Sequence, residues 1–147
     1  MATRPPERVD LDALLEPLLQ FAQDMLRKHG EFFPFGNVMT TEGEIQLVAG
    51  LAGTEHPPST EVIDLLVAGA RARAMAGEIR ATGICYDVRV RGVDGKSTDA
   101  IAVALEHRAG DSVEVLVPYS KRPFGGLQFG ELTAGRGERR IFANGSG

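Results

Sequence analysis

The sequence predicts an α+β domain: two main helices and an antiparallel sheet of five to six strands, in the order α-β-β-α-β-β-β-(β). Two stretches place apolar residues three and four positions apart, as amphipathic helices do, and residues 79–119 alternate apolar and polar side chains between turn signals. A chain of 147 residues is long enough for one hydrophobic core and too short for two. We therefore expect a single domain over residues 9–143, between a flexible N-terminus at 1–8 and a disordered tail at 144–147.

The first helix is predicted from an apolar stripe that ends at Gly30, a residue type that commonly stops helices. Pro17 interrupts this stripe, because a proline ring clashes with the carbonyl one turn earlier. The helix therefore either bends at Pro17 or begins there, with proline as its first residue. The stripe comprises Leu11, Leu14, Leu15, Leu18, Ala22, Met25, Leu26 and His29.

Two short strands are expected over 37–40 and 45–51, with a tight turn between them. The phenylalanines of residues 32–35 are expected to fill the core between the first helix and the sheet, rather than to form a binding platform. A loop with two prolines then leads to a second helix, capped by Ser59 or Thr60. This helix is rich in alanine and glycine, so it could pack closely against the sheet or against a second copy of the chain.

The strands that follow carry the clearest pattern. Ile84, Tyr86 and Val88 alternate with polar residues, and Asp94 with Gly95 is typical of a two-residue hairpin turn. This turn, and a second one at 109–111, collect the large apolar side chains on one face in every register that the turns allow. We expect this face to be the core, with the helices on that side of the sheet. Its members are Ile84, Tyr86, Val88, Ile101, Val103, Leu105, Val113, Val115 and Val117. A last strand is expected over 127–133.

The opposite face of the same strands carries the best defined group of charged residues: Asp87, Arg89, Glu106 and Glu114. Glu106 and Glu114 lie on neighbouring strands, where two carboxylates could bind a cation or act as an acid and a base. The simpler interpretation is a solvated sheet surface, because charged side chains on exposed sheets are common. We favour that interpretation and keep the four residues as a candidate binding surface.

Other reactive side chains give weaker signals. The histidines at 29, 56 and 107 have no metal-ligand spacing, and His107 is expected to be hydrogen-bonded at the core margin. Cys85 is expected to be a small buried hydrophobic residue, since Asp87 and Glu106 on its face would oppose a thiolate. No catalytic residues, metal site or cofactor are predicted. Basic residues at 121, 122, 136, 139 and 140 could form a basic edge, although a solvated tail is favoured.

The composition limits the classes of partner. The chain has a net charge of −4, which argues against nucleic acid as the main partner. A single cysteine is typical of a reducing compartment, and no apolar run is long enough for a membrane span or a signal peptide. These features predict a cytoplasmic protein that does not bind membranes.

The chain resembles a family of small bacterial α+β proteins for which no activity is established. The resemblance lies in residues 31–36, in residues 99–107, and in Pro118 with Tyr119. The order of elements also resembles that of the roadblock and profilin-like folds, which serve as binding and scaffolding modules. This resemblance implies a fold and supplies no site residue.

Our hypothesis from the sequence is a non-enzymatic interaction or scaffold domain whose partner is another protein or a second copy of itself. A homodimer could form through a sheet edge or through the second helix. The alternative is a small-molecule binder or minor hydrolase that uses the polar sheet face around Asp87, Arg89, Glu106 and Glu114. That alternative requires the four side chains to converge in a partly covered hollow.

Overall fold

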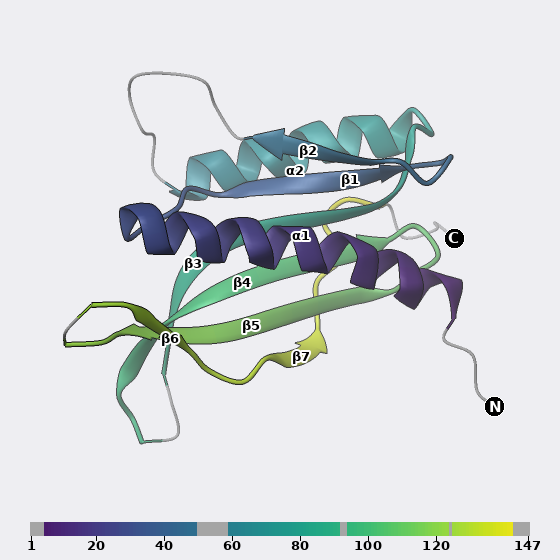
Figure 1. Ribbon diagram of the computed structural model, residues 1–147. Helices are drawn as coiled ribbons and strands as arrows, with labels where there is room; N and C mark the ends of the chain where they lie inside the picture. Colours follow the sequence, from purple (N-terminus) through teal and green to yellow (C-terminus); the bar gives the residue numbers. More distant parts are fainter. Residues whose placement is uncertain (1–4, 50–58, 92–93, 124, 143–147) are drawn as a thin grey trace.

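The computed structural model describes residues 5–49, 59–91, 94–123 and 125–142, which form two helices and one antiparallel sheet (Figure 1). The sheet has seven strands in these residues, in the order β2-β1-β3-β4-β5-β6, and β7 also pairs with β5. This arrangement confirms the predicted α+β class and order of elements. The elements are α1 (Pro6–His29), β1 (Phe35–Thr40), β2 (Ile45–Ala49), α2 (Ser59–Met75), β3 (Ile79–Arg91), β4 (Ser97–His107), β5 (Ser112–Lys121), β6 (Leu127–Phe129) and β7 (Thr133–Arg136).

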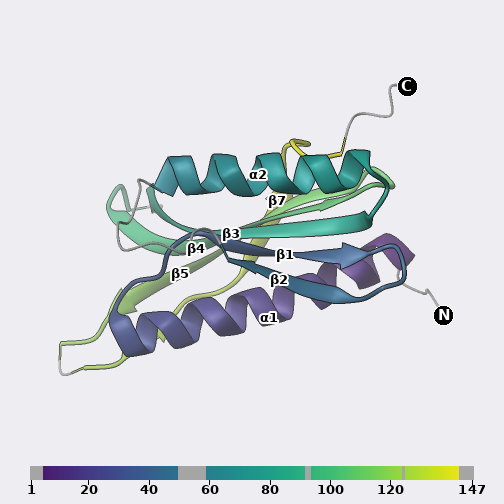
Figure 2. The same cartoon turned by 90° about the horizontal axis from the view of Figure 1, so that it is seen from above.

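The two helices cover opposite faces of the sheet, so the expectation that both lie on one face is wrong. Figure 2 shows α2 on one side of the strands and α1 on the other. Each helix has its own cluster of buried apolar side chains. The sheet therefore forms the middle layer of three, and its central strands are buried on both faces. Neither described helix is long and apolar enough to cross a lipid bilayer.

Helix α1 is continuous through Pro17, so the alternative of a helix starting at that residue is wrong. It begins at Pro6, where a proline costs no hydrogen bond, and residues 6–8 are therefore helical rather than part of a flexible end. It ends at Gly30 as predicted, because this residue adopts a φ of 77° and donates its N–H to the Leu26 carbonyl at 2.9 Å.

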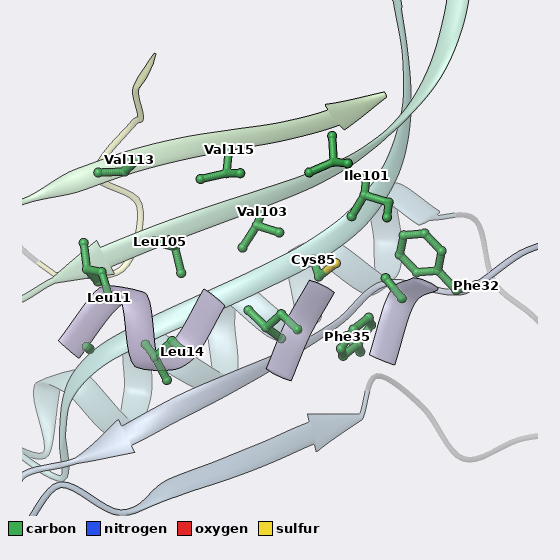
Figure 3. Close-up of a cluster of buried hydrophobic side chains, with 14 of the residues drawn as sticks. Leu11, Leu14, Phe32, Phe35, Cys85, Ile101, Val103, Leu105, Val113 and Val115 are labelled. Carbon is green, nitrogen blue, oxygen red and sulfur yellow. The ribbon is translucent and has the colours of Figure 1, made fainter. Parts of the chain in front are cut away.

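Helix α1 lies very close to the sheet above Gly83. A Cβ atom at this position would be 2.6 Å from Leu18 Cδ1 and 2.9 Å from the side-chain oxygen of Asn37. Only glycine allows this approach. The core beneath α1 contains Phe32 and Phe35, which confirms the predicted role of the aromatic run for two of its three rings, while Phe33 is exposed. Figure 3 shows these rings beside the side chains from β3, β4 and β5.

Helix α2 buries a narrower stripe, formed by Val62, Leu66 and Ala70. It packs on β1 and β3, and the C-terminal residues Ile141 and Phe142 join the same cluster. These two residues lie far from α2 in the sequence and are only 4 and 8 % exposed. The second core is therefore completed by the last described segment.

The predicted register between β3 and β4 is wrong by one residue. Val88 pairs with Ala100, and Asp87 pairs with Ile101, because five residues connect Arg91 to Ser97 instead of the expected two-residue turn. A shift of one residue moves every side chain to the other face. The predicted group is therefore divided. The three predicted residues of β3 lie on the α2 face instead, and Cys85 is the β3 side chain found beneath α1. These three are Ile84, Tyr86 and Val88. The six predicted residues of β4 and β5 lie beneath α1 as expected, namely Ile101, Val103, Leu105, Val113, Val115 and Val117.

The register between β4 and β5 differs from the expected one by two residues, which leaves the faces unchanged. Val103 pairs with Val115, and Leu105 pairs with Val113. The predicted last strand is present as β6, and a further strand, β7, forms in a region where the sequence favours a solvated tail. Both strands return to β5.

Candidate functional site

The four charged residues predicted to share a surface are divided between the two faces of the sheet. Asp87 pairs with Ile101, so Asp87 and Arg89 lie on the α1 face. Glu106 and Glu114 lie on the α2 face, since Glu106 pairs with Thr82 and Glu114 with Ala104. The structure therefore does not bring the four side chains together, and the surface as predicted from the sequence does not exist.

Asp87 belongs to a small polar group at the edge of the α1 face. The Tyr119 hydroxyl donates to both carboxylate oxygens of Asp87, at 2.8 and 2.9 Å, and Arg89 pairs with Asp99 at 3.3 Å. Desolvation raises the pKa of Asp87, and the hydrogen bond from Tyr119 partly opposes this effect. The pKa of Tyr119 is also raised, first by burial and then by its hydrogen bond to Asp87. The tyrosine thus remains a neutral donor.

Glu106 has a structural role that the sequence did not reveal. It is 4 % exposed, and its carboxylate accepts backbone N–H groups from three consecutive residues, Arg140, Ile141 and Phe142, at distances of 2.6 to 3.2 Å. Bonds of this kind to a carboxylate are short and strong. Glu106 therefore fastens the C-terminal segment to the sheet, and the prediction of a solvated side chain is wrong.

Glu114 has a different environment from Glu106. Its side chain is half-buried and accepts a long hydrogen bond of 3.4 Å from the Tyr86 hydroxyl. Burial raises the pKa of Tyr86, and the neighbouring Glu114 raises it further. Glu106 and Glu114 thus have separate partners, which gives no support to a two-carboxylate site.

His107 is buried and hydrogen-bonded, as predicted. Its Nδ1 accepts the Ala109 backbone N–H at 3.0 Å, and its Nε2 lies 2.9 Å from a carboxylate oxygen of Asp10. Because Nδ1 accepts, a neutral ring carries its proton on Nε2 and donates to Asp10. Arg80 binds the other oxygen of Asp10 at 3.1 Å. This network ties the N-terminal part of α1 to β3 and β4.

Cys85 is fully buried, which confirms the prediction for this residue. Desolvation raises the pKa of its thiol, and the charge of Asp87 raises it further, so the reactive thiolate is disfavoured. Among the described residues, no group of three or more histidine, cysteine, aspartate or glutamate side chains is arranged to hold a metal ion.

The outer edge of β2 has the features of a binding site. In an antiparallel pair, residues whose backbone groups bond to the partner alternate with residues whose groups point away. The Thr40 N–H donates to the Glu44 carbonyl, so the backbone groups of Glu44 face β1. With the register of β1 and β2, the groups of residues 46 and 48 face β1 as well. The backbone groups of residues 45, 47 and 49 therefore point outward from the sheet, and β2 is the last strand on this side among the described residues.

The side chains on this edge are also unusual. Ile45 is 40 % exposed and Leu47 is 61 % exposed, and both lie on the α1 face. Natural edge strands are normally protected by charged residues, proline or a bulge. Strand β2, with the sequence Ile-Gln-Leu-Val-Ala, has no charged residue and no proline. Among the described residues, no strand pairs with the outward backbone groups of β2. We call this edge, with its backbone groups and its apolar side chains, the β2 edge.

An apolar groove lies beside the β2 edge on the α2 face. It has a volume of about 190 Å³ and is lined mainly by residues of α2, β1 and β3, such as Leu65 and Val38, and β2 contributes Val48. Gly69 leaves space in its wall, since a Cβ atom added at this residue would have no neighbour within 4 Å. A strand that added to β2 would direct alternate side chains toward this groove.

Searches against protein-family models, curated proteins and solved structures found no match to the chain, so the resemblances drawn from the sequence remain predictions.

The sequence indicated a sheet edge as one possible dimer surface but did not identify β2, although the absence of charged residues in this strand was a visible signal. The structure also separates the basic residues near the C-terminus. Lys121 and Arg122 lie at the end of β5 that is far from β7, whereas Arg139 and Arg140 lie beside α2. The basic edge, which was considered from the sequence but not favoured, is therefore not continuous.

Proposed function

We propose that this protein is a non-enzymatic interaction domain that associates through the β2 edge, with a second copy of the chain as its partner. The observation that carries this proposal is the combination of outward backbone groups at residues 45, 47 and 49 with the exposed side chains of Ile45 and Leu47. Strand addition at such an edge supplies backbone hydrogen bonds, and apolar side chains supply burial.

The β2 edge suits pairing with itself. Its three outward residues are symmetric about Leu47, so an antiparallel pair of β2 strands would match residue 45 with 49 and Leu47 with Leu47. This arrangement has the two-fold symmetry of most homodimers, in which the same surface serves both copies. It would join two sheets into one and cover both leucines.

A cytoplasmic location is part of this proposal. It is supported by the single cysteine, Cys85, which is buried and unpaired and therefore has no need of an oxidising compartment. The alternative partner is an extended segment of another protein. Such a segment could pair with the β2 edge through the same backbone hydrogen bonds.

The dimer is tested by sedimentation velocity on the wild-type chain and on Leu47→Lys. The wild type is expected to sediment as a dimer, and Leu47→Lys as a folded monomer, because two lysines would face each other across the symmetry axis. Leu132→Lys is the matched control, since Leu132 is 43 % exposed and lies outside the edge. A wild type that remains monomeric at high concentration contradicts self-association.

The symmetry is tested separately with Leu47→Cys. Residues that exchange both hydrogen bonds in an antiparallel pair have Cα atoms about 5.5 Å apart, within the range of a disulfide. Oxidation is therefore expected to link two copies through residue 47, while Leu132→Cys remains unlinked. A dimer that sediments as such but does not crosslink through residue 47 would show that another surface forms it.

A further inference from the structure

A second feature of the molecule is independent of the β2 edge. Four arginines surround an open hollow of about 460 Å³ between α2, the β4–β5 turn and the C-terminal segment. They come from three separate parts of the sequence, so no local sequence pattern predicts that they lie together. They are Arg71, Arg108, Arg139 and Arg140, and the rest of the lining is Ala74, Met75, Ile141 and Phe142.

The positive charge in this hollow is largely uncompensated. Among the described residues, no carboxylate lies within 4.0 Å of the guanidinium groups of Arg71, Arg108 or Arg139. Arg140 pairs with Glu138 at 3.4 Å, but the Glu138 side chain is 80 % exposed. Like charges gathered in a concave site repel one another, and an anion bound among them relieves that repulsion. The net charge of the chain is −4, so this local excess is not a general property of the surface.

Two of the four guanidinium groups are held in place by uncharged acceptors. Arg71 donates through Nε and Nη2 to the Arg140 backbone carbonyl, and Arg139 donates through Nη1 to the His107 carbonyl at 3.2 Å. These bonds fix the side chains without neutralising them, and each guanidinium keeps further N–H donors. Holding the donors in advance lowers the entropy lost when a ligand binds.

Glu106, a buried carboxylate that contacts the C-terminal segment, does not compete for these donors. The oxygens of Glu106 are occupied by the backbone N–H groups of residues 140–142. The same three bonds fix the backbone that carries Arg140 and that borders Arg139. The anchoring of the C-terminal segment therefore also assembles one wall of the basic hollow.

We propose that this hollow binds a small phosphate-bearing ligand. A phosphoryl group offers several oxygens within a small volume, so it can accept bonds from several guanidinium groups at once. The volume falls within the usual range of small-molecule sites. Met75, which is 82 % exposed, and the neighbouring Ala74 provide an apolar surface for the organic part of such a ligand. An acidic peptide spreads its carboxylates along an extended chain and matches this compact arrangement less well.

The proposal is tested by isothermal titration calorimetry in physiological salt, with inorganic pyrophosphate, inorganic phosphate and phenyl phosphate as probes. The wild type is expected to bind pyrophosphate saturably at one site. Arg108→Gln is expected to weaken binding about ten-fold or more, the loss typical of a charge-assisted hydrogen bond. Arg108 makes no side-chain hydrogen bond or ion pair with the described residues, so this variant should fold normally. Met75→Glu, which places a carboxylate at the hollow, is expected to weaken binding as well.

Arg122→Gln is the control, because it removes the same charge from an exposed loop distant from the hollow. If Arg122→Gln and Arg108→Gln weaken pyrophosphate binding equally, the probe is attracted by the electrostatic field of the whole protein, and the proposed site is overturned. Absence of saturable binding by the wild type would do the same. A hexaglutamate peptide that bound more tightly than pyrophosphate would overturn the ligand class in favour of acidic peptides. Tighter binding of phenyl phosphate than of inorganic phosphate would support the apolar wall.

Discussion

Replacing Glu106 by glutamine should destabilise the protein far more than the same change at Glu114. Glutamine has nearly the same size as glutamate, but it replaces one acceptor oxygen with an NH₂ group. At Glu106, that group would face backbone donors in a site that is 4 % exposed. The change therefore places donor against donor in a buried position.

The magnitude follows from the three N–H groups that converge on Glu106. One buried donor left without an acceptor costs about 1–3 kcal/mol. The other two bonds lose the charge of their acceptor, which costs about 1 kcal/mol each. The free energy of unfolding should therefore fall by about 3–5 kcal/mol. For Glu114→Gln we expect a change within about 0.5 kcal/mol, because the amide oxygen can still accept the long bond from Tyr86.

Urea unfolding followed by circular dichroism measures both variants, and hydrogen exchange reports the local effect. In the wild type, the amides of residues 140–142 should exchange slowly because they are bound to Glu106. In Glu106→Gln they should exchange at least as quickly as the amides of exposed turns. Equal stability of the two variants, with the three amides still protected in Glu106→Gln, would refute this role of the carboxylate.

Three further predictions follow from other parts of the structure. Leu47→Pro should leave the fold intact, because the Leu47 N–H faces outward, whereas Gln46→Pro removes an N–H that faces β1. Gln46→Pro should therefore lower the stability by about 1 kcal/mol or more in thermal melts. Equal losses for the two variants would contradict the assigned edge. Asp87 should titrate above the usual aspartate range in carbon-13 NMR, and Tyr119→Phe should raise its pKa further, since the hydrogen bond from Tyr119 lowers it. The raised pKa means that the Asp87 carboxyl group holds its proton more tightly in the folded state than in the unfolded state. Its contribution to stability is therefore lost as the pH rises through the raised pKa, and Asp87→Asn should flatten that part of the profile of stability against pH. Leu105→Ala should cost about 2–5 kcal/mol in urea unfolding, whereas Leu132→Ala, at an exposed site, should cost less than about 0.5 kcal/mol.

The local patterns of the sequence were sufficient for the type and order of the elements. The stripe of α1, the stop at Gly30 and the strands on either side of residue 110 all depend on neighbouring residues, and these were predicted correctly. The faces of β3 could not be predicted in the same way, because they depend on whether the connection to β4 has an odd or an even number of residues. Strand β4 did contain a warning. Its apolar residues occur at successive positions, as in Ala102, Val103 and Ala104, and this is typical of a strand covered on both faces.

The candidate site was harder to predict because charge and alternation do not report distant contacts. Glu106 has the pattern of a surface residue, and only the return of residues 140–142 buries it. Likewise, Arg71 and Arg108 are unremarkable in the sequence until the fold places them beside Arg139. These contacts join segments that are more than 30 residues apart, which no local pattern specifies.

The anchoring of the C-terminal segment also has a consequence for the order in which the protein can fold during synthesis. The side chains beneath α1 come from residues no later than 129, so that layer can assemble while the rest of the chain is still being made. The layer beneath α2 lacks Ile141 and Phe142 until much later, and the donors to Glu106 lie 34 to 36 residues further along the chain. Until then, Ile84 and Val38 remain partly uncovered on a sheet that already exists. A chain that ends before residue 140 should therefore have its α1 face covered, while the part of its α2 face that Ile141 and Phe142 fill beside α2 stays open to chaperones or to aggregation.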